Sequence, residues 1–137
     1  MDVRPLPVDL GPDAVHLWQQ SGLTRPWNDP VEDLTRALAG ASSTVLAVVD
    51  EGGLAGTVMV GDDGHRGWLY YLAVAPDRRG RGLGRALVRA AEQWLGARGA
   101  PKVQLMVRAG NEAVLEFYAG LGYTPSDVVV LGRRLDG

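Results

Sequence analysis

The sequence contains no cysteine, which excludes disulfide bridges, thiolate zinc sites, iron–sulfur clusters and a cysteine nucleophile. Long hydrophobic runs are also missing. The longest, such as residues 45–49 and 68–75, fall well short of the roughly 20 residues that span a bilayer. The first residues lack the basic and apolar regions of a secretory signal. We therefore expect a cytoplasmic protein that binds no metal and has no membrane partner.

The composition provides enough apolar residues for one hydrophobic core. The 137 residues are 46% hydrophobic and 22% charged, whereas a disordered chain has few apolar residues and a high net charge. Single domains mostly contain about 100 to 200 residues. The composition therefore predicts one globular domain over residues 1–137.

Charge is distributed unevenly along the chain. Residues 1–64 contain ten acidic residues and three arginines, a net charge of −7, whereas residues 65–137 contain eleven basic and six acidic residues, a net charge of +5. Five arginines fall within twelve residues: Arg78, Arg79, Arg81, Arg85 and Arg89. Such a cluster indicates either a phosphate-bearing partner or a solvated helix face. Nucleic acid is disfavoured, because the isoelectric point is about 5.6 and no basic stripe alternates with exposed aromatics.

Turn residues divide the chain into short elements without an internal repeat. The β-branched runs 44–49 and 54–60 flank a turn at 50–53, which predicts a hairpin. Asp29 followed by Pro30 is typical of a helix start. A strand at 68–75, a helix that begins at Leu83 and stops before Gly99, and a strand at 103–107 indicate a right-handed parallel crossover.

The other expected elements are an edge strand, two helices and a final strand, at residues 1–5, 11–21, 111–120 and 128–131. Strands and helices thus occur in mixed order. The sequence therefore predicts a mixed α+β fold.

The strongest local signal is segment 73–85, where a strand passes through a glycine-rich turn into a helix. Glycines let the backbone approach an anion closely. The N–H groups of the helix's first turn can bind a diphosphate, and Arg79 and Arg81 add positive charge. In the alternative interpretation the glycines only serve the turn. A Walker A loop is excluded because Arg85 follows Gly84, and a dinucleotide-binding motif that starts at Gly80 would require glycine at 85.

Arg79, Gly82 and Gly84 have the spacing Arg or Gln, two residues, Gly, one residue, Gly or Ala. This resembles the acyl-CoA pyrophosphate loop of the GNAT superfamily of N-acetyltransferases. Further matches lie at 72–76, 111–113, 117–118 and 121–123, so the resemblance covers nearly the whole chain. It implies the GNAT fold, a splayed mixed central β-sheet flanked by helices on both faces. Segments 25–30 and 63–67 are similar to the YpeA-type branch.

The resemblance implies acetyl-CoA as the acyl donor. It places the pantetheine arm between strands 68–75 and 103–107. Backbone groups of Leu72 and Val74 would pair with the pantetheine amides, and one N–H would polarise the thioester carbonyl. The implied cofactor-binding residues are Leu72, Ala73, Val74, Arg79, Gly80, Arg81, Gly82, Leu83, Gly84, Arg85, Asn111 and Tyr118.

Tyr118 matches the family's tyrosine that protonates the departing CoA thiolate, which implies a general acid. A phenol with a pKa near 10 stays protonated at neutral pH and can donate to the sulfur. Its alternative role is that of a core tyrosine. Asn111 would contact the pantetheine arm or the thioester region, or cap the helix that follows it.

The general base is where this sequence departs from relatives. In the ribosomal N-terminal acetyltransferase branch a glutamate lies on the strand before Asn111, and Met106 occupies the corresponding position here. The remaining candidates are Asp63 and His65 in the turn before strand 68–75, with Tyr70 and Tyr71 on the strand itself. A histidine has the most suitable pKa for a base near neutrality, but both turn residues could instead stabilise the turn.

Residues near the start of the helix expected after Asp29 could bind the acceptor. Trp27, in a proline-bounded loop, would form a wall of the acceptor pocket or anchor the loop. Asp29, with Tyr70 and Tyr71, completes the predicted substrate-binding set, and acidic side chains could attract a cationic acceptor.

Together these features predict transfer of an acetyl group from acetyl-CoA to a primary amine by direct attack in a ternary complex. The acceptor would be a small-molecule amine or a protein or peptide amine. The alternative is a catalytically silent acyl-CoA-binding sensor or regulatory module. The chain would be a monomer, or a homodimer paired through the strand at 128–131.

Overall fold

The computed structural model describes residues 2–136. The chain forms two compact units, one that ends at Leu105 and one that begins at Met106, and each is described by itself. The single domain expected from the length stays a prediction. Of the edge strand expected at 1–5, Met1 lies outside the described residues, and Arg4 and Pro5 form the strand.

The first unit contains a five-stranded sheet in the order β1-β2-β3-β4-β5. Its first three pairings are antiparallel and the pairing of β4 with β5 is parallel, which confirms the predicted hairpin and parallel crossover strands. The strands are β1 (Arg4–Pro5), β2 (Ser43–Asp50), β3 (Gly53–Asp62), β4 (Gly67–Val74) and β5 (Val103–Gln104).

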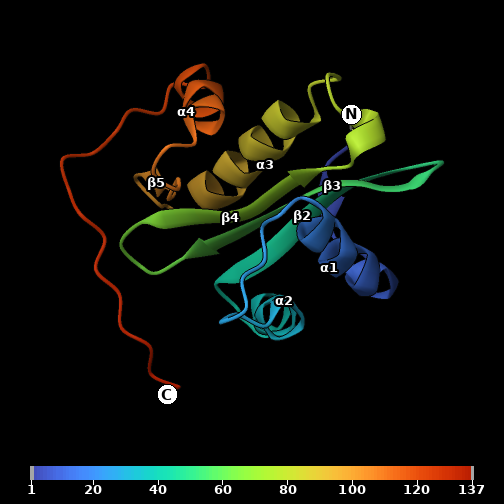
Figure 1. Ribbon diagram of the computed structural model, residues 1–137, viewed down its shortest axis with the longest axis horizontal. Coiled ribbons are helices and arrows are strands. Elements are labelled where there is room, and N and C mark those ends of the chain that lie inside the picture. The colour runs from blue at the N-terminus through green and yellow to red at the C-terminus, as the bar shows by residue number, and fades with distance from the viewer. Residues whose placement is uncertain (1, 137) are drawn as a thin grey trace. The chain divides into compact units, whose positions relative to one another are not determined.

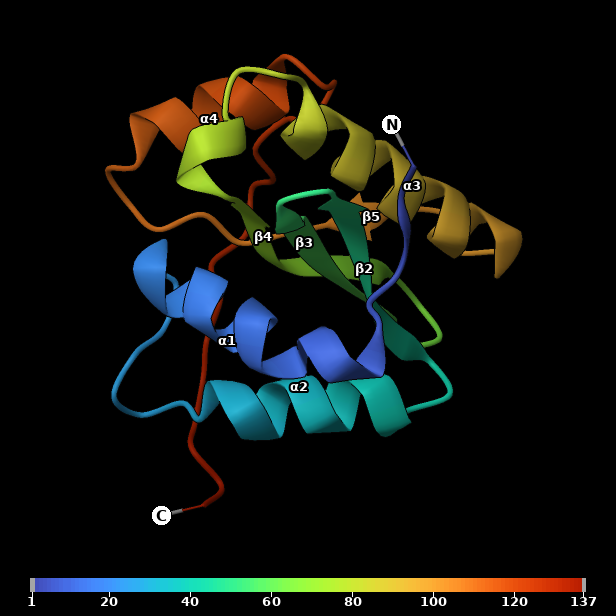
Figure 2. The same ribbon diagram turned by 90° about the vertical axis from the view of Figure 1, so that its right-hand side faces the viewer.

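Helices cover both faces of this sheet, as predicted. Figure 1 shows α1 and α2 on one face and α3 on the other, and the side view in Figure 2 shows the same arrangement. The helices are η1 (Val8–Leu10), α1 (Gly11–Gln20), α2 (Pro30–Ala39), η2 (Pro76–Arg78) and α3 (Leu83–Ala97). None of the described helices is long and apolar enough to cross a membrane.

Asp29 begins α2 in the way its sequence predicts. Its side chain accepts hydrogen bonds from the N–H groups of Val31, at 3.0 Å, and Glu32, at 3.3 Å. Pro30 then occupies the first turn, where its missing N–H costs nothing. The cap fixes where α2 starts beside the sheet.

A continuous apolar core lies between α1, α2 and the sheet. Trp18 is its largest fully buried side chain, and burial of an aromatic side chain is among the strongest single contributions to a core. Around it pack residues of α1, α2, β2 and β4, among them Ala14, Leu17, Leu34, Ala37, Val45, Ala47 and Ala73.

The opposite face depends on two glycines where α3 crosses the sheet. A Cβ at Gly56 would lie 2.9 Å from Leu87 Cδ1 and 3.0 Å from the carbonyl oxygen of Ala73. A Cβ at Gly67 would lie 2.4 Å from Leu95 Cδ1. Because real Cβ atoms essentially never lie under 3.0 Å from another atom, a side chain at either position would force the neighbouring leucine of α3 to shift.

The close packing of α3 predicts the effect of a methyl group at Gly67. Gly67→Ala is expected to lower the free energy of unfolding by about 1–3 kcal/mol, because Leu95 is fully buried and must move. Gly96→Ala is the matched control on α3, where an added Cβ meets nothing within 4 Å. It is expected to raise the free energy of unfolding by up to about 1 kcal/mol. Urea denaturation measures both, and equal stabilities of wild type and Gly67→Ala would contradict this packing.

The described residues of the second unit, 106–136, contain one helix, α4 (Glu112–Ala119). Asn111 caps it as predicted, because its side-chain oxygen accepts a hydrogen bond from the N–H of Val114 at 3.3 Å. Tyr118 and Leu121 are buried.

The predicted strand at 128–131 is wrong. These residues form no strand, and their side chains are 63–90% exposed. Their β-branched residues favour an extended backbone, but a strand also needs a hydrogen-bonded neighbour. The edge pairing suggested for a homodimer therefore loses its basis.

The strand predicted at 103–107 is shorter than expected. The strand β5 ends at Gln104, so Leu105 and Val107 lie outside it. Its pairing with β4 is confined to Gly67–Val103 and Trp68–Gln104. The alternation of apolar residues therefore continues beyond the point where strand pairing stops.

Candidate functional site

A bulge interrupts β4 near its middle. Thr57 pairs with Ala73, but the next pair is Met59 with Tyr70, so Tyr71 and Leu72 together face one residue of β3. Tyr71 has φ +51°, the single positive φ among non-glycine residues that the structure describes. This left-handed backbone costs about 1–3 kcal/mol in a residue with a side chain. Strain of this kind clusters at functional sites. No residue type in the sequence predicted it.

Four side chains hold the bulge in place. The Tyr71 ring stacks on Trp18, with centroids 4.0 Å apart, and its hydroxyl donates to Asp33 Oδ2 at 2.7 Å. Burial, followed by the hydrogen bond to Asp33, raises the pKa of Tyr71. Thr57, fully buried on β3, donates to the Tyr71 carbonyl oxygen at 3.0 Å and accepts from Trp18 Nε1 at 2.8 Å.

Sequence reasoning missed this network. A threonine within the apolar run of β3 was the available signal, because a buried hydroxyl needs hydrogen-bond partners.

Beyond the bulge, β4 has backbone groups on its outer side. The Ala75 N–H donates to the Ala55 carbonyl at 2.8 Å on the β3 side. Successive residues of a strand direct their N–H groups to alternate sides, so those of Leu72 and Val74 point away from β3. Ala73 lies between them, pairs with Thr57 and is buried in the core. Since β5 pairs only with the first two residues of β4, no strand of the described residues takes up the outer groups of Leu72 and Val74.

The glycine-rich turn follows directly and leads into α3. Gly80 has φ +79° and Gly82, the N-cap, has φ +81°, conformations that glycine adopts without strain. A Cβ at either position would meet nothing within 4 Å. Gly82 provides no side-chain cap, so the first N–H groups of α3 are open to an anion.

The residues after this turn differ in burial. Leu83 is buried and anchors the helix, Gly84 is half-buried, and Arg85 is exposed. Arg79 and Arg81 are exposed as well. Three cations are thus accessible beside the uncapped helix end.

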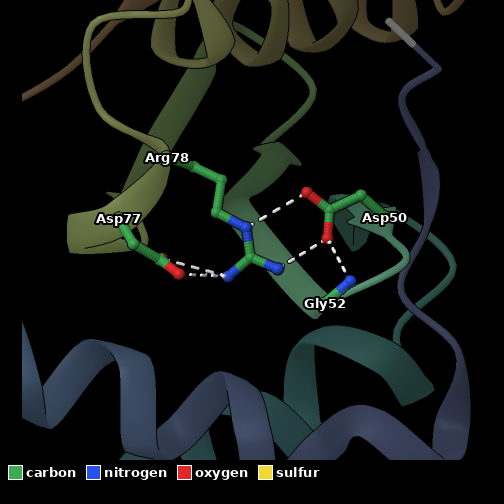
Figure 3. Close-up of polar contacts among 4 residues, drawn as sticks. All are labelled: Asp50, Gly52, Asp77 and Arg78. Carbon is green, nitrogen blue, oxygen red and sulfur yellow. Dashed lines mark hydrogen bonds and ion pairs between the residues drawn. The ribbon is translucent and has the colours of Figure 1, made fainter.

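Arg78 has a different task from the other arginines of the cluster. It donates through Nε and Nη2 to the two oxygens of Asp50, at 3.1 and 2.6 Å, and through Nη1 to Asp77 at 3.0 Å (Figure 3). Asp50 also accepts from the N–H of Gly52 at 2.9 Å, and the Arg78 hydrogen bond is the main cause of its lowered pKa. A Cβ at Gly52 would lie 2.2 Å from Arg78 Nη2. Arg78 therefore ties the start of the glycine-rich turn to the β2–β3 hairpin.

Asp63 and His65 lie in the β3–β4 turn, before the start of β4. Asp63 accepts from the N–H groups of His65 and Arg66, at 2.8 and 2.7 Å, and from Trp68 Nε1 at 3.0 Å. These hydrogen bonds, led by that of Arg66, lower the pKa of Asp63. His65 is exposed, with its Nδ1 3.4 Å from Arg66 Nη1. From Gly67 to Tyr71 the strand extends about 13 Å, so the turn and the bulge are well separated.

The predicted acceptor residues fall into two groups. Trp27 and Tyr70 are exposed, at 57% and 42%, and burial, with a smaller effect of the Asp63 charge, raises the pKa of Tyr70. Asp29 caps α2, and Tyr71 belongs to the bulge network. The structure therefore gives Asp29 and Tyr71 structural partners and leaves Trp27 and Tyr70 accessible.

Two predicted residues lie in the second unit. Tyr118 is buried and packs edge-to-face on Phe117 and Tyr123, with centroid distances of 5.0 and 5.4 Å. Burial raises its pKa to about 12. Asn111 caps α4, and Met106, which the resemblance puts at the base position of the ribosomal branch, is 51% exposed.

A family model described as Acetyltransferase (GNAT) family matches residues 12–123. The chain belongs to the GNAT acetyltransferase family. An acetyltransferase of Yersinia pestis is 44% identical to it over 135 residues, 98% of this chain and 96% of the relative. These matches identify the chain as an acetyltransferase, and family membership implies the use of acetyl-CoA.

Solved structures share the fold of this GNAT chain. One of them is AAC(6')-Iy in complex with a bisubstrate analog of CoA and acetylneamine, with a TM-score of 0.82 at 18% identity over 97% of both chains. The ribosomal-protein-S18-alanine N-acetyltransferase of Escherichia coli has a TM-score of 0.76 at 25% identity, over 91% of this chain and 78% of that one. The predicted GNAT fold is thereby confirmed.

The burial of Tyr118 predicts an alkaline titration. Its pKa of about 12 lies above the ordinary value of 10.0, so its contribution to stability is complete below pH 10 and is lost as the pH rises through 12. Ultraviolet absorbance of tyrosinate measures this, and Tyr118→Phe is expected to remove a transition near pH 12. Loss of a transition near pH 10 instead would contradict the buried position.

Proposed function

We propose that this chain transfers the acetyl group of acetyl-CoA to a primary amine by direct attack in a ternary complex. One observation carries the proposal. The outward N–H groups of Leu72 and Val74 lead directly into a glycine-rich turn whose helix has no side-chain cap. This continuous run of backbone donors suits a ligand that has amide groups at one end and a diphosphate at the other.

The chain's residues fit each part of acetyl-CoA. The space beside Gly80 and Gly82 lets a diphosphate reach the N–H groups of Leu83, Gly84 and Arg85, and Arg79, Arg81 and Arg85 would balance its charge. The backbone of Leu72 and Val74 would bind the pantetheine amides as an added strand would.

Polarisation of the thioester carbonyl falls to an outward N–H of β4 in this proposal. A donor already oriented toward the developing oxyanion lowers the barrier without reorganising during the reaction. Acetyl-CoA itself supplies the activated thioester.

Tyr118 would protonate the CoA thiolate as it leaves. A phenol whose pKa is raised to about 12 by burial holds its proton throughout the neutral range, so it is in the form that can hydrogen-bond to the departing sulfur and protonate it. The side-chain oxygen of Asn111 accepts the capping hydrogen bond. Its side-chain NH2 group would contact the pantetheine arm.

The proposal contains no general base from the β3–β4 turn. Both oxygens of Asp63 already accept hydrogen bonds, which makes Asp63 a poor base, and we assign it to stabilising the turn. His65 lies on the same turn, away from the bulge. The attacking amine would therefore lose its proton to solvent before it attacks.

The acceptor would approach past Trp27 and Tyr70, the accessible members of the predicted set. Asp29, Glu32 and Asp33 at the start of α2 favour a cationic amine by long-range attraction. AAC(6')-Iy, which shares the fold, has been solved with an analog that joins CoA to an aminoglycoside, so small cationic amines are the first acceptors to test. Membership in the YpeA-type branch and a cytoplasmic location stay predictions.

A silent acyl-CoA-binding module is the second candidate. The observation that favours it is Met106, which carries no carboxylate at the base position of the ribosomal branch. Release of CoA that depends on an added amine separates the two candidates, because a sensor would bind acetyl-CoA without turnover.

A thermal-shift experiment tests the donor site. Acetyl-CoA and CoA are expected to raise the melting temperature, and NAD and ATP at the same concentrations are not, because a ligand of the folded state stabilises it by RT ln(1 + [L]/Kd). Gly82→Trp is expected to abolish the shift by filling the open space beside the turn.

Gly99→Trp is the matched control. Gly99 has φ +83° against +81° at Gly82, and neither position has an atom within 4 Å of an added Cβ. Both variants therefore carry the same backbone strain. Retained acetyl-CoA binding in Gly82→Trp, or equal loss in the two variants, would contradict the site.

Tyr118→Phe tests the general acid. We expect kcat for the best amine in a panel to fall about 100-fold, the usual contribution of a positioned acid, while the Kd of CoA measured by calorimetry changes far less. An equal loss of kcat and CoA affinity would indicate a core tyrosine instead.

A further inference from the structure

Thr57 hydrogen-bonds to two groups, the indole N–H of Trp18 and the carbonyl oxygen of Tyr71. The Trp18 indole nitrogen can only donate, so the Thr57 oxygen accepts from it at 2.8 Å and must direct its own proton to the Tyr71 carbonyl at 3.0 Å. Trp18 and Thr57 are both fully buried, so water does not compete for the hydrogen bond between them. The chemistry of the three groups thus fixes the direction of the whole chain of hydrogen bonds.

The Tyr71 carbonyl shares a peptide unit with the Leu72 N–H. The described residues contain no cis peptide bond, and in a planar trans peptide the oxygen and the hydrogen point in opposite directions. A carbonyl held toward Thr57 therefore holds the Leu72 N–H away from Thr57. This orientation agrees with the outward direction obtained from the hydrogen bond of Ala75 to Ala55.

The side chain of Tyr71 is anchored separately. Its ring and hydroxyl contact Trp18 and Asp33, and neither contact involves the peptide that joins Tyr71 to Leu72. Of the side-chain hydrogen bonds that the structure shows at the bulge, that from Thr57 is the one that holds this peptide, through its carbonyl oxygen.

We propose that Thr57 is a positioning residue for acetyl transfer, whose buried hydroxyl aims the Leu72 N–H at the thioester carbonyl of acetyl-CoA. Thr57 acts through the Tyr71–Leu72 peptide and does not touch the substrate. The inference rests on the proposed function and adds to it the residue that sets the direction of the carbonyl-binding donor.

Thr57→Val removes the hydroxyl with little change in size. Its methyl group can neither donate nor accept, and at 3.0 Å from the Tyr71 oxygen it would push the carbonyl away. Thr57→Ser retains the hydroxyl and is the rescue variant. Thr35→Val makes the same chemical change at an exposed site, where the hydroxyl donates to the Val31 carbonyl of its own helix at 2.9 Å.

The first measurement is the amide resonance of Leu72 in a 15N-labelled sample. In wild type and in Thr57→Ser, acetyl-CoA is expected to move the Leu72 proton downfield relative to CoA, because CoA lacks the thioester carbonyl. In Thr57→Val this difference is expected to disappear. Thr35→Val is expected to behave as wild type.

The second measurement is turnover with the best amine of a panel. Removal of one oriented donor to an oxyanion costs about 100- to 1,000-fold in kcat, and we expect Thr57→Val to lose at least about tenfold of kcat by misdirecting that donor. The Kd of CoA is expected to stay within about threefold of the wild-type value, well under the tenfold that 1.4 kcal/mol represents.

The outcomes separate the two levels of the proposal. If wild type binds neither acetyl-CoA nor CoA, the proposed function and this inference both fail. If wild type acetylates an amine and Thr57→Val does so equally well, only this inference fails. Should Thr57→Val not fold, the wild-type spectra decide alone, because equal shifts of Leu72 with acetyl-CoA and CoA overturn the inference.

Discussion

The left-handed backbone at Tyr71 is the constraint on which the arrangement of β4 depends. Before it, β4 pairs with strands on both sides, and after it the described ladder continues only with β3. A strained residue in the middle of a sheet persists only when its surroundings determine its conformation. Here those surroundings come from three elements: Trp18 on α1, Asp33 on α2 and Thr57 on β3. The core on the α1 and α2 face is therefore also the support of the candidate site.

At the glycine-rich turn, neighbouring arginines have different roles. Arg78 is 12% exposed in its side chain and binds Asp50 with both arms of its guanidinium group. Arg78 thereby holds η2, the turn to which it belongs, against the β2–β3 hairpin. Arg79, Arg81 and Arg85 are exposed, and they can serve a ligand without weakening that attachment. A count of arginines could not separate these roles, because the separation depends on Asp50, which lies 28 residues away in sequence.

Elements determined by local sequence were predicted well. The hairpin, the Asp29 cap of α2, the glycine-rich turn and α3 each depend on residues that are close in sequence. The failures share a cause as well. At 128–131 a β-branched run, and at 105–107 an alternation of apolar residues, favour a strand, but a strand exists only where a distant segment pairs with it.

The bulge is the opposite case, since its stability comes from contacts that join Trp18, Asp33 and Thr57 to Tyr71 across 14 to 53 residues. A single sequence does not reveal such contacts. The resemblance to the GNAT family still directed attention to Leu72 and Val74, because the family pattern includes the strand and not only the loop. The resemblance could not indicate that Thr57 hydrogen-bonds to the Tyr71 carbonyl beside them.

The outward N–H groups of Leu72 and Val74 have a consequence for how this strand can change. Main-chain donors are common to nineteen of the twenty amino acids, and proline alone lacks one. At these two positions, binding through the backbone would tolerate any side chain that packs. The ability of the strand to bind a ligand therefore depends on its backbone conformation and not on its side chains. Its tolerance to substitution is set by the core beneath it, where position 57 needs a hydroxyl that both accepts from Trp18 and donates to the Tyr71 carbonyl.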